Sequence, residues 1–249
     1  MNYSKICYNY EMNKIIFFDT ETTGNTDKDY LCQIAYKDND LEFNKLYKPP
    51  VRIPAEASAV HHISNKMVED KPLFKESEDY KNLKDLFESN ETISVAHNAP
   101  FDIGILKNED ISVAKFICTL RVARALDPEE SLSSYRLQFL RYALDIEIEA
   151  IAHDAFGDVL VLEKLFDRLK NKIKTTENIN DEEAIARMIE ISSHPSIFKR
   201  LNFGKHKGKT IEEVVSTDRG WLEWLLGEKM KSDQNEEDWI YTLKHYLNK

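Results

Sequence analysis

A short run of β-forming residues that ends in two acids constrains the fold of this chain most. Residues Lys14 to Phe18 read KIIFF, and the segment DTETTGNTD follows them. Bulky apolar residues in a run of this length, followed by turn-forming residues, predict a buried strand. The strand would deliver Asp19 to its carboxyl end, a place where α/β proteins commonly carry catalytic groups.

The second acid, Glu21, stands two residues after Asp19. Side chains two apart on a strand point to the same face, so these carboxylates would lie side by side. They would repel each other unless a positive charge sits between them. Mg²⁺ and Mn²⁺ suit the place because these cations prefer oxygen ligands. By itself, such a pair is also typical of a solvated strand end.

The remaining elements predict a mixed α/β sheet flanked by helices. Further strands are expected at Leu31 to Tyr36, Leu41 to Tyr47 and Thr92 to Ala96, and the first two form a hairpin. Helices are expected at Glu76 to Phe87, Ser133 to Tyr142 and Ala155 to Lys170. This order of elements is that of an α/β fold.

The length of 249 residues allows one large core and a small second domain. The chain turns polar between Asn171 and Glu183, which indicates a boundary. We expect a catalytic domain over 1–172, a linker with a short helix over 173–193, and a small C-terminal domain over 194–249. No apolar run approaches the roughly 20 residues of a membrane span, and the N-terminus does not look like a secretory signal, so we expect a cytoplasmic protein without a membrane segment.

The net charge of −10 argues against a nucleic-acid partner, because polyanions are usually held by Lys and Arg. Acids that bind metal ions nevertheless become local cationic sites. Positive charge is also concentrated in one segment, Lys199 to Lys209, which reads KRLNFGKHKGK and contains no acid. The objection therefore applies to the surface as a whole and not to this segment.

Two further segments carry acids beside expected helices. Asp102 lies in HNAPFDIGIL, whose Pro100 is well placed at the start of a helix. His153 and Asp158 lie in HDAFGDVLVL, at the approach to the long later helix. Each acid alone is typical of a charge at a helix terminus.

Taken together, FFDTETTG, HNAPFD and HDAFGD closely resemble the three exonuclease motifs of the DEDD superfamily, histidine subclass, in the same order. The resemblance covers Lys14 to about Leu169. It implies a ribonuclease H-like fold in which four carboxylates hold two Mg²⁺ or Mn²⁺ ions at one end of the sheet, with His153 as the general base. The metal-binding and catalytic carboxylates would be those of Asp19, Glu21, Asp102 and Asp158.

These residue types suit phosphodiester hydrolysis. Paired metals about 3.5 to 4 Å apart can stabilise both the attacking and the leaving oxygen. A histidine with an ordinary pKa near 6.5 can take the proton of the attacking water at neutral pH. We therefore expect a 3′-to-5′ exonuclease that releases nucleoside 5′-monophosphates from DNA, in repair or proofreading. An exoribonuclease of the same superfamily remains an alternative, because the residues do not distinguish DNA from RNA.

Two more segments resemble parts of related enzymes. The stretch AEASAVHHIS is similar to one in DnaQ-like exonucleases that approaches the terminal nucleotide, which implies that Glu56 and His61 help to hold the substrate. We also expect Glu21 and Thr22 to bind substrate, with Thr22 and Thr23 close to the terminal sugar. The sequence has His62 where those proteins commonly have glycine.

The second segment is LNFGKHKGKTIEEVV with WLEWLL after it, which is similar to the small C-terminal module of exonuclease X-type proteins. Gly204 and Gly208 allow a tight turn. The turn would bring together three lysines that contact nucleic-acid phosphates, namely Lys205, Lys207 and Lys209. The aromatic residues of the module, such as Trp221 and Trp224, serve either as a stacking surface or as core.

Two other classes of protein stay open. A phosphatase could use Asp19 as a nucleophile, but it would leave HNAPFD and HDAFGD unexplained. A non-catalytic nucleic-acid-binding subunit would not need all five catalytic positions. Metal-dependent release of mononucleotides distinguishes an exonuclease from both.

Overall fold

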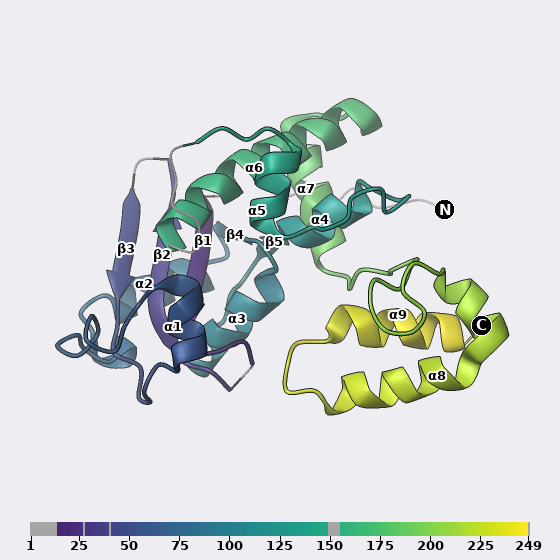
Figure 1. Cartoon of the computed structure of the whole chain (residues 1–249). Helices are drawn as coiled ribbons and strands as arrows, with labels where there is room; N and C mark the ends of the chain where they lie inside the picture. Colours follow the sequence, from purple (N-terminus) through teal and green to yellow (C-terminus); the bar gives the residue numbers. More distant parts are fainter. Residues whose placement is uncertain (1–13, 27, 40, 149–154, 249) are drawn as a thin grey trace.

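A computed structural model describes residues 14–248 except 27, 40 and 149–154 (Figure 1). Its centre is a five-stranded sheet in the order β3-β2-β1-β4-β5. Strands β1, β2 and β3 are antiparallel neighbours, and β4 and β5 run parallel to β1. The strands are β1 (Lys14–Thr22), β2 (Leu31–Lys37), β3 (Glu42–Leu46), β4 (Thr92–Ala96) and β5 (Phe116–Cys118).

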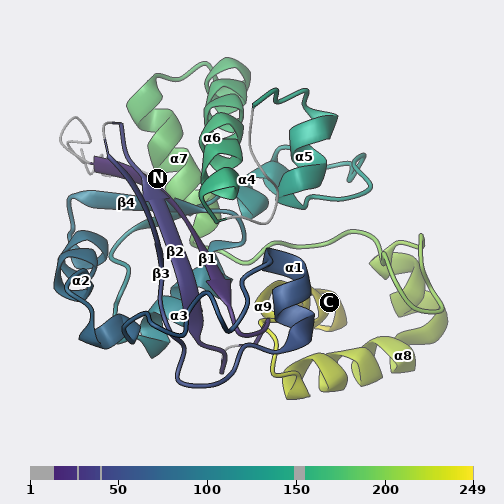
Figure 2. The same cartoon turned by 60° about the vertical axis from the view of Figure 1, so that its left-hand side comes forward.

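Helices cover both faces of the sheet, as the two views show (Figures 1 and 2). One face carries α4 (Thr119–Ala125), α5 (Leu137–Ala143), α6 (Ala155–Glu177) and α7 (Asp181–Ser192). The other carries α2 (Tyr80–Glu88) and α3 (Ala99–Asn108). A short helix, α1 (Ala55–His61), and a 3₁₀ turn at Phe74–Glu76 complete this part of the chain. The expected mixed α/β fold is confirmed.

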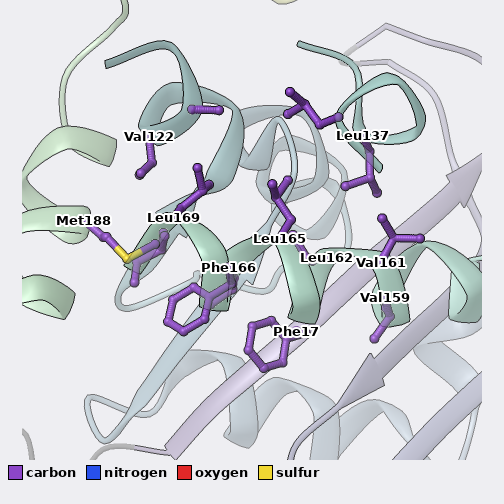
Figure 3. Close-up of a cluster of buried hydrophobic side chains, with 14 of the residues drawn as sticks. Phe17, Val122, Leu137, Val159, Val161, Leu162, Leu165, Phe166, Leu169 and Met188 are labelled. Atoms are coloured by element: carbon purple, nitrogen blue, oxygen red, sulfur yellow. The ribbon is translucent and has the colours of Figure 1, made fainter. Parts of the chain in front are cut away.

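The side chains of β1 alternate between the two faces, and both faces are buried. Phe17 points toward α6, where its ring meets that of Phe166 edge to face at 5.3 Å (Figure 3). Phe18 points the other way and meets Phe87 of α2 at 5.0 Å. A strand buried on both faces has a continuous apolar sequence, which explains why KIIFF was recognisable.

Two helices begin later than the sequence pattern indicates. The helix expected from Glu76 begins at Tyr80, after the 3₁₀ turn. The helix expected from Ser133 begins at Leu137. Asp127 accepts hydrogen bonds from the Leu132 backbone N–H and from the Tyr135 hydroxyl, and these bonds hold the segment before α5 in a loop.

The segment 173–193 differs from the expected linker with a short helix. Helix α6 continues to Glu177, and after a short turn α7 begins at a capping box made by Asn180 and Glu183. Three of its side chains are fully buried in the core on the α6 face of the sheet, namely Ile173, Ala184 and Met188. This segment packs into the core on the α6 face of the sheet because its apolar side chains have helical spacing. The domain boundaries themselves remain a prediction.

The C-terminal part folds around a core of its own. Helices α8 (Ile211–Lys231) and α9 (Glu237–Leu247) pack side by side (Figure 1). The core contains Leu201, Ile211, Val214, Leu222, Leu225, Leu243, Tyr246 and Leu247. Trp221 packs against it, whereas Trp224 is 56% exposed and is not a core residue. None of the helices in the described part of the chain is long and apolar enough to cross a membrane.

Ionic contacts join the C-terminal part to the sheet domain. Arg121 of α4, only 5% exposed, donates to the Ser192 carbonyl and pairs with Glu237 of α9. Its neighbour Arg124 pairs with Asp238 at 2.7 Å. Removing the C-terminal part would leave the buried Arg121 without this carboxylate partner, which is costly for the fold.

The packing of α7 predicts the effect of one substitution. Met188→Ala should lower the free energy of unfolding of the whole chain by about 2–5 kcal/mol, because a fully buried side chain is truncated. Denaturant unfolding followed by circular dichroism would measure this. Exposed Glu182 of the same helix, changed to Ala, is the control. An unchanged midpoint for Met188→Ala would mean that α7 is a linker after all.

Candidate active site

The carboxyl end of β1 places two acids on the α6 face of the sheet. Asp19 and Glu21 follow Phe17 in the alternation of the strand, so all three side chains share that face. At the end of the strand the pairing with β2 becomes irregular. Glu21 pairs with Gln33 and the next residue, Thr22, pairs with Leu31. Irregular pairing of this kind is frequent beside active sites, where it redirects side chains.

A third acid reaches the same place from α6. Asp158 lies in the first turn of this helix, which packs across β1 and β2. One carboxylate oxygen from each of Asp19, Glu21 and Asp158 lies within 4.8 Å of the others, and all three residues are partly buried. The structure therefore brings together three of the four expected carboxylates, as an acidic cluster that could hold a metal ion.

Asp102 approaches β1 from α3 on the opposite face. Its Oδ1 accepts hydrogen bonds from the backbone N–H of Thr20 at 3.2 Å and from the Thr20 hydroxyl at 2.7 Å. Thr20 stands between Asp19 and Glu21, so Asp102 is tied to the same strand end without being part of the cluster of three. Burial raises the pKa of Asp102 to about 7, although the bonds from Thr20 work in the opposite direction.

The composition of this group fits a hard divalent cation. The cluster offers only carboxylate oxygens, which Mg²⁺ and Mn²⁺ prefer over soft metals. Three carboxylates so close together repel one another, and a cation among them removes that repulsion. The raised pKa of buried Asp102 also indicates a carboxylate that a nearby cation would help to ionise. His153, the expected general base, lies outside the described residues.

Gln138 of α5 is a neighbour of the cluster that the sequence did not reveal. Its side-chain amide donates to Oδ1 of Asp158, and its own oxygen faces Arg141 at 3.5 Å. The bond fixes the orientation of the Asp158 carboxylate, as partners behind metal ligands commonly do. A glutamine in an amphipathic helix carries no local signal of this role, because the contact spans two separate helices.

The loop after β1 is held firmly beside the cluster. Asp29 accepts hydrogen bonds from the Thr23 hydroxyl and from the backbone N–H and hydroxyl of Thr26. Burial acts to raise the pKa of Asp29, but these bonds outweigh it and lower the pKa. A Cβ atom on Gly24 would lie 2.6 Å from the Asp29 carboxylate, so this close approach requires glycine.

His61 supports the strand end from α1. Its Nδ1 accepts from the Ile63 backbone N–H at 3.0 Å, so Nε2 carries the proton and donates to the Thr22 carbonyl at 3.2 Å. Burial lowers the pKa of His61, which keeps the ring neutral. Both ring nitrogens thus bond to the backbone. His62 adopts a left-handed conformation with φ of 62°, a region of backbone conformation that favours glycine.

The other expected substrate contacts lie in two places. Glu56 is exposed in the first turn of α1. In the C-terminal part, Gly204 and Gly208 have positive φ angles and form the expected turn. Lys205 pairs with Asp218 at 2.6 Å, whereas Lys207 and Lys209 are exposed. The substrate-binding roles of Thr22, Glu56, His61 and the three lysines, which no contact in the structure tests, remain predictions.

Removing one acid of the cluster should raise the melting temperature of the metal-free chain and should abolish its stabilisation by Mg²⁺. In metal-free buffer, Asp158→Asn should raise the melting temperature because it relieves like-charge repulsion. Mg²⁺ should then stabilise the wild-type chain but not the variant, since a ligand that binds only the folded state raises its stability. Exposed Asp85 of α2, changed to Asn, is the matched control. An equal Mg²⁺ shift in wild type and Asp158→Asn would place the metal elsewhere.

Comparison with proteins of known sequence finds similar enzymes. Exodeoxyribonuclease 10 of Escherichia coli strain K12 is 29% identical over 204 residues, which cover 81% of this chain and 83% of that protein. DNA polymerase III subunit epsilon of Treponema pallidum is 33% identical over 164 residues, 60% of this chain and 73% of that protein.

Solved structures show the same fold. Exonuclease X in complex with 5′ overhanging duplex DNA aligns with a TM-score of 0.55 and 24% identity, covering 72% of this chain and 99% of that one. E. coli Exonuclease I in complex with a dT13 oligonucleotide aligns with a TM-score of 0.55 and 21% identity over 67% of this chain, which spans 43% of that larger protein. The expected ribonuclease H-like architecture is confirmed.

Two family models match separate parts of the sequence. The model described as exodeoxyribonuclease X-like C-terminal matches residues 201–229, which include the basic turn and most of α8. The model described as exonuclease matches residues 16–166, from β1 into α6, and this stretch contains all three acidic motifs. Because the match spans more than half of the chain, the protein belongs to the exonuclease family.

Proposed function

We propose that this exonuclease removes nucleotides from the 3′ end of DNA by hydrolysis and releases nucleoside 5′-monophosphates. The observation that supports the proposal most is the cluster of Asp19, Glu21 and Asp158 at the end of β1. DNA is favoured because the similar proteins are named as an exodeoxyribonuclease and as subunits of a DNA polymerase. A role in DNA repair or proofreading, in the cytoplasm, follows as part of the same proposal.

The carboxylates would hold two Mg²⁺ ions, or Mn²⁺ in their place. When bound, such ions stabilise the negative charge that develops on the phosphate oxygens. Asp19, Glu21 and Asp158 supply the clustered oxygens, and Gln138 keeps the Asp158 carboxylate in one orientation. Asp102 joins them in its ionised form, which a nearby cation favours despite burial.

Other groups of the chain bind the terminal nucleotide and move the proton. Asp29 fixes Thr23 and Thr26 through hydrogen bonds, and His61 bonds to the Thr22 carbonyl, so the sugar meets a firmly held surface after β1. His153 accepts the proton of the attacking water and must be neutral to do so. An exoribonuclease with the same carboxylates remains the second candidate, because both polymers present the same phosphodiester to them.

Degradation of matched substrates tests the proposal. Single-stranded DNA, single-stranded RNA and a recessed duplex, each labelled at either end, would be incubated with Mg²⁺ or with a chelator. We expect labelled mononucleotides to appear first from the 3′ label, faster from DNA than from RNA, and only with metal. Faster release from RNA would support the exoribonuclease. Binding of the strands without any metal-dependent release would indicate a non-catalytic subunit.

The assignment of His153 predicts a change in the pH profile. His153→Ala should lower the turnover rate by about 10²–10⁴, the usual contribution of a general base. The wild-type rate should rise between about pH 6 and 7, as the imidazole loses its proton, and the variant should lose this rise. Rates at saturating substrate across this range would measure both effects. A slower variant that keeps the wild-type profile would mean that another group is the base.

A further inference from the structure

A cleft separates the sheet domain from the C-terminal part. Its volume is about 1110 Å³, and both parts of the chain line it. The sheet domain contributes the segment from His97 to Pro100, residues of α4 and the loop before α5. The C-terminal part contributes the basic segment and the start of α9. This volume is close to the upper end of the roughly 300–1,000 Å³ of a typical small-molecule site, so the charge of the lining, and not the size of the cleft, indicates the occupant.

The lining of the cleft is basic although the chain as a whole is acidic. Six lining residues are Lys or Arg and four are Asp or Glu, in a chain of net charge −10. Two of the four acids form ion pairs, whereas the other two accept hydrogen bonds from uncharged groups and keep their charge. Asp238 pairs with Arg121 and Arg124, and Glu236 pairs with a lysine of α8. Asp127 and Glu130 accept hydrogen bonds from backbone N–H groups.

Three of the lining cations have no such partner. Within the described part of the chain, Arg136, Arg200 and Lys207 form no ion pair with an acid, and all three are exposed. The guanidinium of Arg200 donates to the uncharged Gly208 carbonyl. Uncompensated positive charges along a concave surface attract a polyanion.

The walls of the cleft are fixed to each other on two sides. On one side, Arg121 and Arg124 of α4 pair with Glu237 and Asp238 of α9. On another side, the Glu130 carboxylate accepts from the backbone N–H groups of Lys199 at 2.6 Å and Arg200 at 3.0 Å. These contacts preform the cleft before any ligand binds, which reduces the entropic cost of binding.

The lining of the cleft lies close along the chain to residues that carry or support the carboxylates. Asn98 and Pro100 line it and lead directly into α3, which carries Asp102. The loop before α5 lines the same side, where the His97 ring bonds to the Tyr135 carbonyl, and its Arg136 lies two residues before Gln138, whose side chain bonds to Asp158. This proximity along the chain favours a strand that reaches both the acidic cluster and the cleft.

We propose that this cleft holds the sugar-phosphate backbone of the strand that is being degraded, 5′ to its terminal nucleotide. Arg136 from the sheet domain and Arg200 and Lys207 from the C-terminal part bind its phosphates. The proposal rests on the proposed exonuclease function and adds the path of the substrate across both parts of the chain. Lys205, which Asp218 engages, is not part of this path.

Binding measurements at several salt concentrations test the proposal. The anisotropy of a labelled single-stranded oligodeoxythymidine would be followed with divalent metal chelated, so that the strand is not degraded. Each neutralised phosphate contact contributes about 0.7 to the salt slope on a single strand, so Arg136→Gln and Lys207→Gln should each lower the slope by about 0.7, and the double variant by about 1.4. Point variants are used because deletion of the C-terminal part would expose the buried Arg121.

Matched controls separate this effect from a general change in charge. Lys81→Gln and Lys172→Gln remove the same charge from exposed sites outside the cleft and should keep the wild-type slope. The p-nitrophenyl ester of thymidine 5′-monophosphate spans only the terminal nucleotide and is too short to enter the cleft, so its hydrolysis by the wild-type chain reports on the proposed exonuclease function independently of the cleft. Melting temperatures would confirm that every variant is folded.

Each contrary result has a distinct meaning. A slope that falls equally in the control variants, or does not fall in Arg136→Gln and Lys207→Gln, overturns the cleft proposal. The two variants could instead lose binding to a glutamate-rich peptide while their salt slope for DNA stays unchanged. That result would assign the cleft to a protein partner and would also overturn the cleft proposal. If wild type does not hydrolyse the ester while the slopes fall as expected, the cleft proposal stands and the proposed exonuclease function fails.

Discussion

Repulsion among carboxylates at the end of β1 is the constraint on which the rest of the structure depends. Packing of α6 across β1 brings Asp158 to Asp19 and Glu21, and α3 ties Asp102 to the same strand end. Each helix is fixed by apolar contacts, such as that between Phe17 and Phe166. The core therefore forces like charges together, and a divalent cation is the partner that makes this arrangement favourable.

Much of the fold and the acids of the site could be predicted from the sequence, because their signals are local. A strand buried on both faces, like β1, is a continuous apolar run, and β4 has the bounds that its composition indicates. The acids were recognisable because each lies in a motif beside the end of an element. His62 also stands out, because it occupies a left-handed backbone position that favours glycine.

What could not be predicted depends on contacts between distant segments. Nothing local in the sequence links Gln138 to Asp158. The polar residues around the turn between α6 and α7 suggest a linker, although Met188 of α7 is fully buried. Trp224 is exposed although Trp221, three residues earlier on α8, packs against the core of the C-terminal part. The cleft requires two separately folded parts, and its charge emerges only when the partners of each acid are known.

The metal-binding role of the carboxylate cluster is tested most directly with a modified DNA strand. In this strand, sulfur replaces one non-bridging oxygen of the 3′-terminal phosphodiester. If the carboxylate cluster holds metal against this phosphate, one sulfur stereoisomer should be hydrolysed much more slowly than the normal strand in Mg²⁺, which binds sulfur poorly. Mn²⁺, which accepts sulfur more readily, should restore much of the rate. Equal slowing by sulfur in Mg²⁺ and in Mn²⁺ would show that no metal contacts the scissile phosphate, and would contradict the role assigned to Asp19, Glu21 and Asp158.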